Sequence, residues 1–285
     1  MGKKSKQHTL WLLAAVSAPL AHFSGCGWGS ALTAVLVTLP LVLIPKCWEG
    51  MSRTLALIQM IWLGAVAGLL IQNSAVYWPS DQEWVVPLTL LALAAVTSKG
   101  AAPRIGAVLA FCIGLLALPV VLTGSAQVEP EWLCWSGNGW PAAVSLVLLL
   151  PALPAAGESR QTRRSIWTGL MAVCLSLLVQ GTISPQVAAS VPDPFFQAAR
   201  TLGYQEPIAA AGMTLGWYAM AIYLLQSAAL IANNSYISAK TAHVLPVGTA
   251  FAAVVFQWQL DLQKSLVLSV ILWILMPFLT KIKKS

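Results

Sequence analysis

Apolar segments of membrane-spanning length recur along the whole sequence, and they constrain the fold more than any other feature. A helix needs about 20 mostly apolar residues to cross the hydrocarbon core of a bilayer. Ten segments meet this criterion at least approximately: residues 8–24, 28–45, 54–75, 84–98, 104–123, 139–157, 165–189, 210–232, 243–260 and 265–280. We therefore predict an all-α polytopic membrane protein with about ten transmembrane helices, which form a single transmembrane domain over residues 1–285.

The distribution of charge supports this prediction and gives an orientation. Only 9% of the 285 residues are charged, whereas soluble domains carry about 25%. If the N-terminus is inside, ten spans leave only Arg200 and Lys264 of the 16 basic residues outside. Since Lys and Arg favour the cytoplasmic side, we predict that both termini are cytoplasmic. The net charge of +7 is scattered over short loops, so we expect the lipid bilayer and not nucleic acid as a partner.

Two of the predicted helices are interrupted by proline. In the first, Leu10–Trp28, Pro19 removes a backbone donor and clashes with the preceding turn. The sixth carries three prolines, among them Pro154. Ten spans divide into halves of five, residues 1–124 and 139–285, and an odd number of spans inverts the second half. Paired interruptions in two halves indicate a transporter-type binding site, so we predict a five-plus-five inverted repeat with broken helices one and six.

The candidate ligand-binding residues flank these interruptions. No Asp, Glu, Lys or Arg lies in the centre of a predicted span, but freed backbone groups and half-helix dipoles can hold a zwitterionic amino acid. His22 either takes part in binding or is hydrogen-bonded to a neighbour near the outer mouth. The predicted ligand residues are Ser17, Ala18, Pro19 and His22 in the first helix, Leu153, Pro154, Ala155 and Ala156 in the sixth, and Tyr223 and Gln226 in the eighth.

Other polar, small and aromatic residues leave alternatives open. Amides within the spans either bind a polar solute or hydrogen-bond neighbouring helices, and they include Gln59, Gln72, Gln180 and Gln226. Two GxxxG patterns, which begin at Gly64 and Gly212, favour close helix packing. The outer loops, such as VPDPFFQAARTLGYQEP, are rich in aromatic residues and form either an interfacial belt or an outer lid or docking face.

The sequence shows no motif typical of an enzyme. It contains no phosphate-binding glycine motif, no CxxC pair among its five cysteines, and no nucleophile–base set or metal-ligand cluster in or near the spans. We therefore expect no enzymatic activity, no cofactor and no metal site.

Three stretches carry a family resemblance. Gln7–Pro45 has a polar lead-in, a mid-helix proline and a short outer turn, GCGWG. Gly203–Ile231 has Glu206 before its span and Trp217 near its middle, and a basic turn, Lys99–Arg104, precedes the fifth span. These features resemble the spore-germination permease family, the B subunits of endospore germinant receptors, within the amino acid–polyamine–organocation superfamily.

The resemblance implies a function and partners. It implies a broken-helix inverted repeat that binds a small amino acid or similar nutrient between helices one, three, six and eight. It also implies a bacterial cell membrane, such as the spore inner membrane, with a membrane-associated A subunit and a lipoprotein C subunit as partners. Gly27 stands where that family usually has a carboxylate. Our leading hypothesis is thus a nutrient receptor or transporter subunit in spore germination. The alternatives are a ten-helix drug/metabolite-type exporter and a structural membrane subunit without a ligand.

Overall fold

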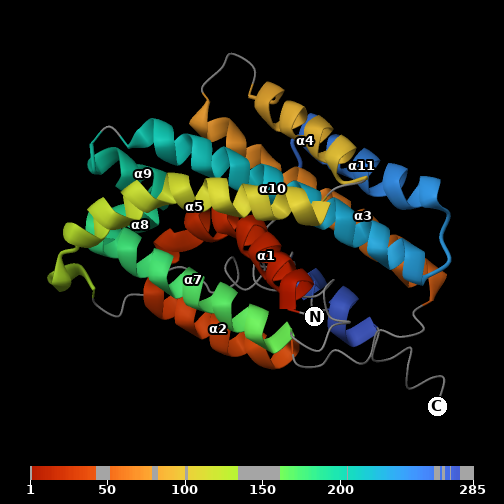
Figure 1. Ribbon diagram of the computed structural model, residues 1–285, viewed down its shortest axis with the longest axis horizontal. Helices are drawn as coiled ribbons and strands as arrows, with labels where there is room; N and C mark the ends of the chain where they lie inside the picture. The colour runs from red at the N-terminus through yellow and green to blue at the C-terminus, as the bar shows by residue number, and fades with distance from the viewer. Residues whose placement is uncertain are drawn as a thin grey trace.

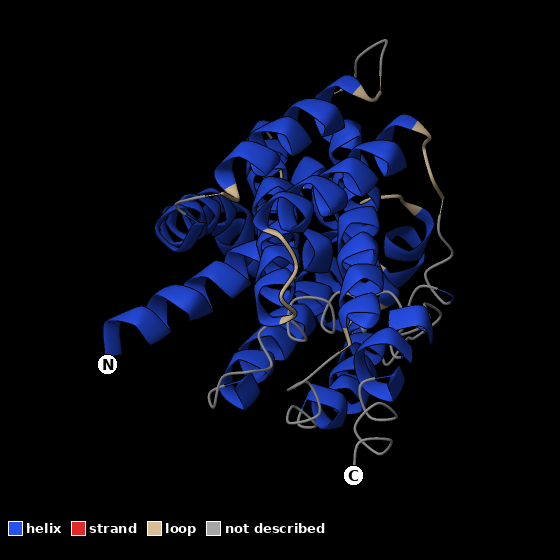
Figure 2. Cartoon of the chain, turned by 90° about the vertical axis from the view of Figure 1, so that its right-hand side faces the viewer, coloured by secondary structure: helices blue, strands red, loops and turns tan. Residues whose placement is uncertain are grey.

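All regular secondary structure described here is helical (Figure 2). The computed structural model describes residues 2–42, 52–78, 83–99, 102–133, 161–203, 205–259, 264, 267–269 and 271–276. The α-helices are α1 (Gly2–His22), α2 (Trp28–Val42), α3 (Arg53–Ile71), α4 (Val85–Thr97), α5 (Ala102–Ala126), α7 (Gln161–Ile183), α8 (Pro185–Ser190), α9 (Pro194–Thr201), α10 (Glu206–Asn234) and α11 (Ala239–Val255). The 3₁₀ helices are η1 (Phe23–Cys26), η3 (Gln72–Tyr77) and η4 (Pro130–Trp132), and η5 (Ile271–Leu275) is a π-helix.

Within the described ranges, four helices are long and apolar enough to cross a membrane. They are Arg53–Tyr77, Ile105–Ala126, Ile166–Ile183 and Glu206–Asn233. Other apolar helices are shorter: the 13 residues of α4 extend only about 20 Å, less than the ~30 Å hydrocarbon core. The chain is therefore a multi-pass helical membrane protein, but the described residues do not show ten spans. The predicted sixth span, 139–157, lies outside them.

Helix α10 lies at the centre of the bundle because its sequence is apolar on every side. Trp217, Met220 and Leu224 are fully buried along it. It packs against α1, α3, α4, α5 and α11. Helices α4 and α11 lie along one edge of the molecule, and α2 and α7 lie side by side along the opposite edge (Figure 1).

Glycines set the closest helix contacts. A Cβ added at Gly64 would lie 2.3 Å from the Pro246 carbonyl oxygen, and one added at Gly68 would lie 2.4 Å from that of Ala250. This confirms the predicted packing role of the first GxxxG pattern, which joins α3 to α11. Gly216 performs the same role between α10 and α1, since its added Cβ would lie 2.6 Å from Ala18 Cβ.

Three of the amides within the predicted spans hydrogen-bond the backbone of another segment. The Nε2 atoms of Gln59, Gln72 and Gln180 donate to carbonyl oxygens at 2.8 Å in each case. The acceptors belong to Leu272, Ala253 and Trp132, respectively. For these three residues the structure supports the interhelical alternative.

One face of α5 is apolar and exposed. Val108, Phe111, Leu115, Leu118 and Leu122 are each more than half exposed. Their spacing of three and four residues places them on one side of the helix. Exposed apolar surface of this extent requires an apolar environment, and a lipid bilayer provides it.

The predicted break of the first helix at Pro19 is wrong. Helix α1 continues through Pro19 to His22, although residue 19 cannot donate a hydrogen bond to the Ala15 carbonyl. Ala15 and Leu20 are almost fully buried, and packing against neighbouring helices keeps the turn helical in spite of the lost bond. The chain leaves the α-helical path only after His22, and it turns at Gly27, whose φ of 84° favours glycine.

Candidate functional site

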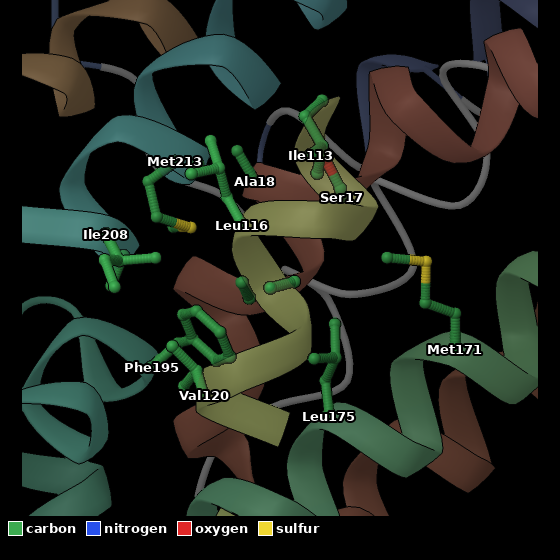
Figure 3. Close-up of a pocket in the computed structure, with 14 residues that line it drawn as sticks. Ser17, Ala18, Ile113, Leu116, Val120, Met171, Leu175, Phe195, Ile208 and Met213 are labelled. Atoms are coloured by element: carbon green, nitrogen blue, oxygen red, sulfur yellow. The ribbon is translucent and has the colours of Figure 1, made fainter. Parts of the chain in front are cut away.

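A cavity of about 60 Å³ lies between α1, α5, α7, α9 and α10. Figure 3 shows side chains from these helices converging around it. Ser17 contributes the single hydroxyl among the lining residues, and the other side chains are apolar. The lining residues are Ser17, Ala18, Ala21, Ile113, Leu116, Ala117, Val120, Met171, Leu175, Phe195, Ile208, Ala209, Gly212 and Met213.

Small residues on the facing helices create this space. Ser17, Ala18 and Ala21 give α1 a shallow surface, and Gly212 leaves a gap on α10. A Cβ added at Gly212 would meet only Leu116 Cβ, at 3.5 Å, so that position faces open space. One turn further along α10, at Gly216, α10 contacts α1, and this contact closes that end of the cavity.

A buried polar cluster lies beside the cavity, and we call it the His22–Asp193 cluster (His22, Tyr77, Asp193 and Trp217). His22 Nδ1 is 3.1 Å from Asp193 Oδ2, and the Tyr77 hydroxyl donates to the same oxygen. Trp217 Nε1 donates to the Tyr77 hydroxyl at 3.2 Å. The His22 ring meets Trp217 edge-on, with centroids 5.6 Å apart. The cluster therefore links α1, η3, α10 and the segment before α9.

Asp193 is buried, and it caps α9. Its Oδ1 accepts a 2.9 Å hydrogen bond from the Phe196 backbone N–H, and Pro194 occupies the first helical position. Phe195 and Phe196 are also buried and anchor the helix to the bundle. The side chain is only 1% exposed, and its hydrogen bonds offset the cost of burying a charge.

The aromatic stretch at α9 forms part of the cavity wall. The Phe195 side chain lines the cavity, and Phe196 packs edge-on against Tyr77 with centroids 5.1 Å apart. These two side chains of the loop therefore pack into the bundle, and the interfacial belt and the outer lid or docking face both stay predictions.

A charged pair lies at the surface of α9. Arg200 donates to Glu206 through Nη2 at 2.8 Å and through Nε at 3.3 Å. This hydrogen bonding raises the pKa of Arg200 above its ordinary value. Both side chains are at least 40% exposed, so the pair contributes little to stability and takes no part in the cluster.

The predicted ligand residues fall into three groups. Ser17 and Ala18 line the cavity, and His22 belongs to the neighbouring cluster, which is the hydrogen-bonded alternative that its position suggested. Pro19 lines neither feature, and Tyr223 and Gln226 lie away from the cavity. Tyr223 follows Met213 by roughly 15 Å along α10 and packs against Trp11, with ring centroids 5.9 Å apart. Leu153, Pro154, Ala155 and Ala156 lie outside the described residues.

Sequence reasoning missed Asp193 and Tyr77. It assigned Asp193 to an outer loop, although the Asp-Pro-Phe-Phe sequence carries the signal of a capped, partly apolar helix. No local signal links these residues to one another. His22 and Asp193 are 171 positions apart along the chain, and Tyr77 and Asp193 are 116 positions apart.

No model of a known protein family matches this chain, and no curated protein matches it. The resemblance to spore-germination permeases therefore stays a prediction. What the site can do has to be inferred from its own geometry and chemistry.

Proposed function

We propose that this protein is a non-enzymatic, transporter-fold membrane protein that binds a small solute in the cavity beside α1, in order to sense or to move it. The observation that carries the proposal is the cavity itself, which lies against the central helix α10 and is lined by Ser17 and Ala18. Of the three helices expected around the ligand, α1 and α10 line the cavity, whereas α3 packs on α10 without lining it.

The cavity walls favour a small aliphatic group. An apolar cavity of ~150 Å³ in a protein core holds benzene, and this one has less than half that volume. An aliphatic side chain fits such a space and an aromatic ring does not. In this proposal the hydroxyl of Ser17 and the predicted interruption of the sixth helix at Leu153–Ala156 hold the polar end of the solute.

The resemblance supplies the biological setting of the proposal. The solute is then a small amino acid or similar nutrient, and the protein is a germinant-receptor subunit that works with an A subunit and a lipoprotein C subunit. It resides in a bacterial cell membrane with both termini in the cytoplasm.

The continuous α1 favours a second candidate function. An exporter of the drug/metabolite type has unbroken first helices, and α1 passes through Pro19 without a break. Both candidates bind a solute: an exporter carries it across the membrane, whereas a receptor subunit senses it without transport. Uptake by proteoliposomes that contain the purified protein separates transport from sensing.

A series of amino acids tests the proposed solute. Each additional buried CH₂ contributes about 0.8 kcal/mol, or about four-fold in affinity. Affinity should therefore rise from glycine through alanine to valine and fall for phenylalanine. A solute at about 100 times its dissociation constant should stabilise the purified protein by roughly 2.7 kcal/mol, which a thermal-shift measurement detects.

Two matched substitutions locate the binding. Gly212→Leu places a side chain in the cavity, whereas Gly114→Leu makes the same change on α5 where no atom lies within 4 Å of the new Cβ. We expect Gly212→Leu to abolish the thermal shift and Gly114→Leu to preserve it. Equal shifts in both variants would place the solute elsewhere and contradict the proposal.

A further inference from the structure

The His22–Asp193 cluster joins α1 to the wall of the cavity. His22 directly follows Ala21, which lines the cavity from α1. Asp193 stands two positions before Phe195, which lines the cavity from α9. The contact between His22 and Asp193 therefore fixes the position of α9 relative to α1 at the edge of the cavity.

His22 contacts Asp193 through Nδ1, so its second ring nitrogen, Nε2, is the atom of this contact that can take up a proton. Histidine gains or loses a proton between about pH 5 and 8. Its side chain is 11% exposed, which leaves a route for a proton, whereas Asp193 is buried. Among the described residues, the titratable groups that face His22 are Asp193 and, through Asp193, Tyr77; α10 presents the uncharged Trp217.

The hydrogen bonds of Asp193 prepare it to hold a cation. Its Oδ1 accepts from the Phe196 N–H, and its Oδ2 accepts from Tyr77 and faces His22 Nδ1. Nδ1–H can thus remain donated to Oδ2 while a proton binds to Nε2. A hydrogen bond between two charged groups is about twice as strong as one between neutral groups.

We propose that His22 is a proton-binding site that clamps α9 to α1. Uptake of one proton at Nε2 converts the His22–Asp193 hydrogen bond into an ion pair, with Nδ1–H still directed at Oδ2. Loss of that proton restores the weaker bond and loosens α9, together with Phe195. The consequence for solute binding in the cavity rests on the function proposed above, but the clamp itself does not.

Hydrogen exchange of the backbone amides in α9 tests the clamp without any solute. The full-length protein in nanodiscs is compared at pH 8 and pH 5.5, with correction for the intrinsic pH dependence of exchange. We expect exchange across residues 196–202 to be about ten-fold slower at pH 5.5, since the stronger bond must break before α9 opens. Equal corrected rates at the two pH values would overturn the proposal.

Three variants identify the responsible group. His22→Asn keeps a donor for Asp193 but cannot take up a proton, and Asp193→Asn keeps the helix cap but removes the negative charge. Both should lose the pH response. Glu206→Gln removes an exposed carboxylate near the same helix and should keep it. A pH response that survives His22→Asn, or that disappears in Glu206→Gln, would assign the effect to another group.

Solute binding is measured separately at the same two pH values. If the clamp responds to pH and no amino acid binds, the proton site stands and the proposed function fails. If a solute binds and the corrected exchange rates in α9 are the same at both pH values, the proposed function stands and the clamp is refuted.

Discussion

At the scale of single residues, Asp193 is the position at which most interactions converge. Its carboxylate receives hydrogen bonds from Tyr77 and from the Phe196 N–H and pairs with His22. A buried charge that loses its partners is strongly destabilising, so each donor contributes to the fold as well as to the site.

Removal of the Tyr77 hydroxyl tests this network. Tyr77→Phe leaves the buried Trp217 N–H without its acceptor and takes one donor from Asp193. We expect the free energy of unfolding to fall by about 1–3 kcal/mol, as measured by denaturant titration in mixed micelles. Tyr218→Phe is the matched control, because its half-buried hydroxyl bonds Thr97 alone among the described residues, and it should cost less than 1 kcal/mol. If both variants lost the same free energy of unfolding, the Tyr77 hydroxyl would contribute no more than an isolated hydroxyl, and the network would not stabilise the fold.

At the scale of helices, close contact between α1 and α10 holds the site together. Gly216 permits it, since an added Cβ would lie 2.6 Å from Ala18 Cβ and 2.9 Å from Ser17 Oγ. We expect Gly216→Ala to separate the two helices and to lower the free energy of unfolding by about 1–3 kcal/mol. Gly248→Ala, which meets no atom within 4 Å, should instead raise it by about 0.5–1 kcal/mol through helix propensity. If Gly216→Ala stabilised the protein as Gly248→Ala does, the proposed close contact between α1 and α10 would be contradicted.

Hydropathy predicts where the helices lie, but the sequence does not show whether a proline interrupts one of them. The observed α3, α4, α5 and α10 begin and end within a few residues of their predicted spans, because long apolar runs dominate local structure. The interruption at Pro19 was mispredicted because neighbouring helices hold α1 straight, and packing of that kind has no signature in the sequence of one helix.

At the scale of the whole molecule, the length of α10 determines on which sides of the membrane the segments before and after it lie. Its 29 residues extend about 43 Å, which exceeds the ~30 Å bilayer core. The exposed Ser190, before α10, and the exposed Ser238, after it, should therefore lie on opposite sides of the membrane.

Cysteine labelling in intact cells checks this topology. In a background without native cysteines, we expect Ser190→Cys to react with a membrane-impermeant maleimide from outside. Ser238→Cys should react only after the cells are permeabilised. The reverse pattern would overturn the predicted orientation, and reaction of both from outside would show that α10 does not span the membrane.

The candidate site was predictable only in part. Small residues beside a proline in an apolar helix indicated Ser17 and Ala18, and both line the cavity. Tyr223 was chosen because it shares a helix face with Gly216, but it lies too far along α10 to reach the cavity. Asp193 and Tyr77 meet His22 only through the tertiary fold, so no local pattern could have placed them there.

The most direct test of the proposed function is to observe the cavity while a solute binds. Methionine methyl groups labelled with ¹³C offer probes inside it, at Met171 and Met213, and outside it, at Met60. On addition of the tightest-binding amino acid, the NMR signals of Met171 and Met213 should shift in proportion to occupancy while that of Met60 stays in place. Saturated binding that leaves both cavity signals unmoved would contradict the proposed site.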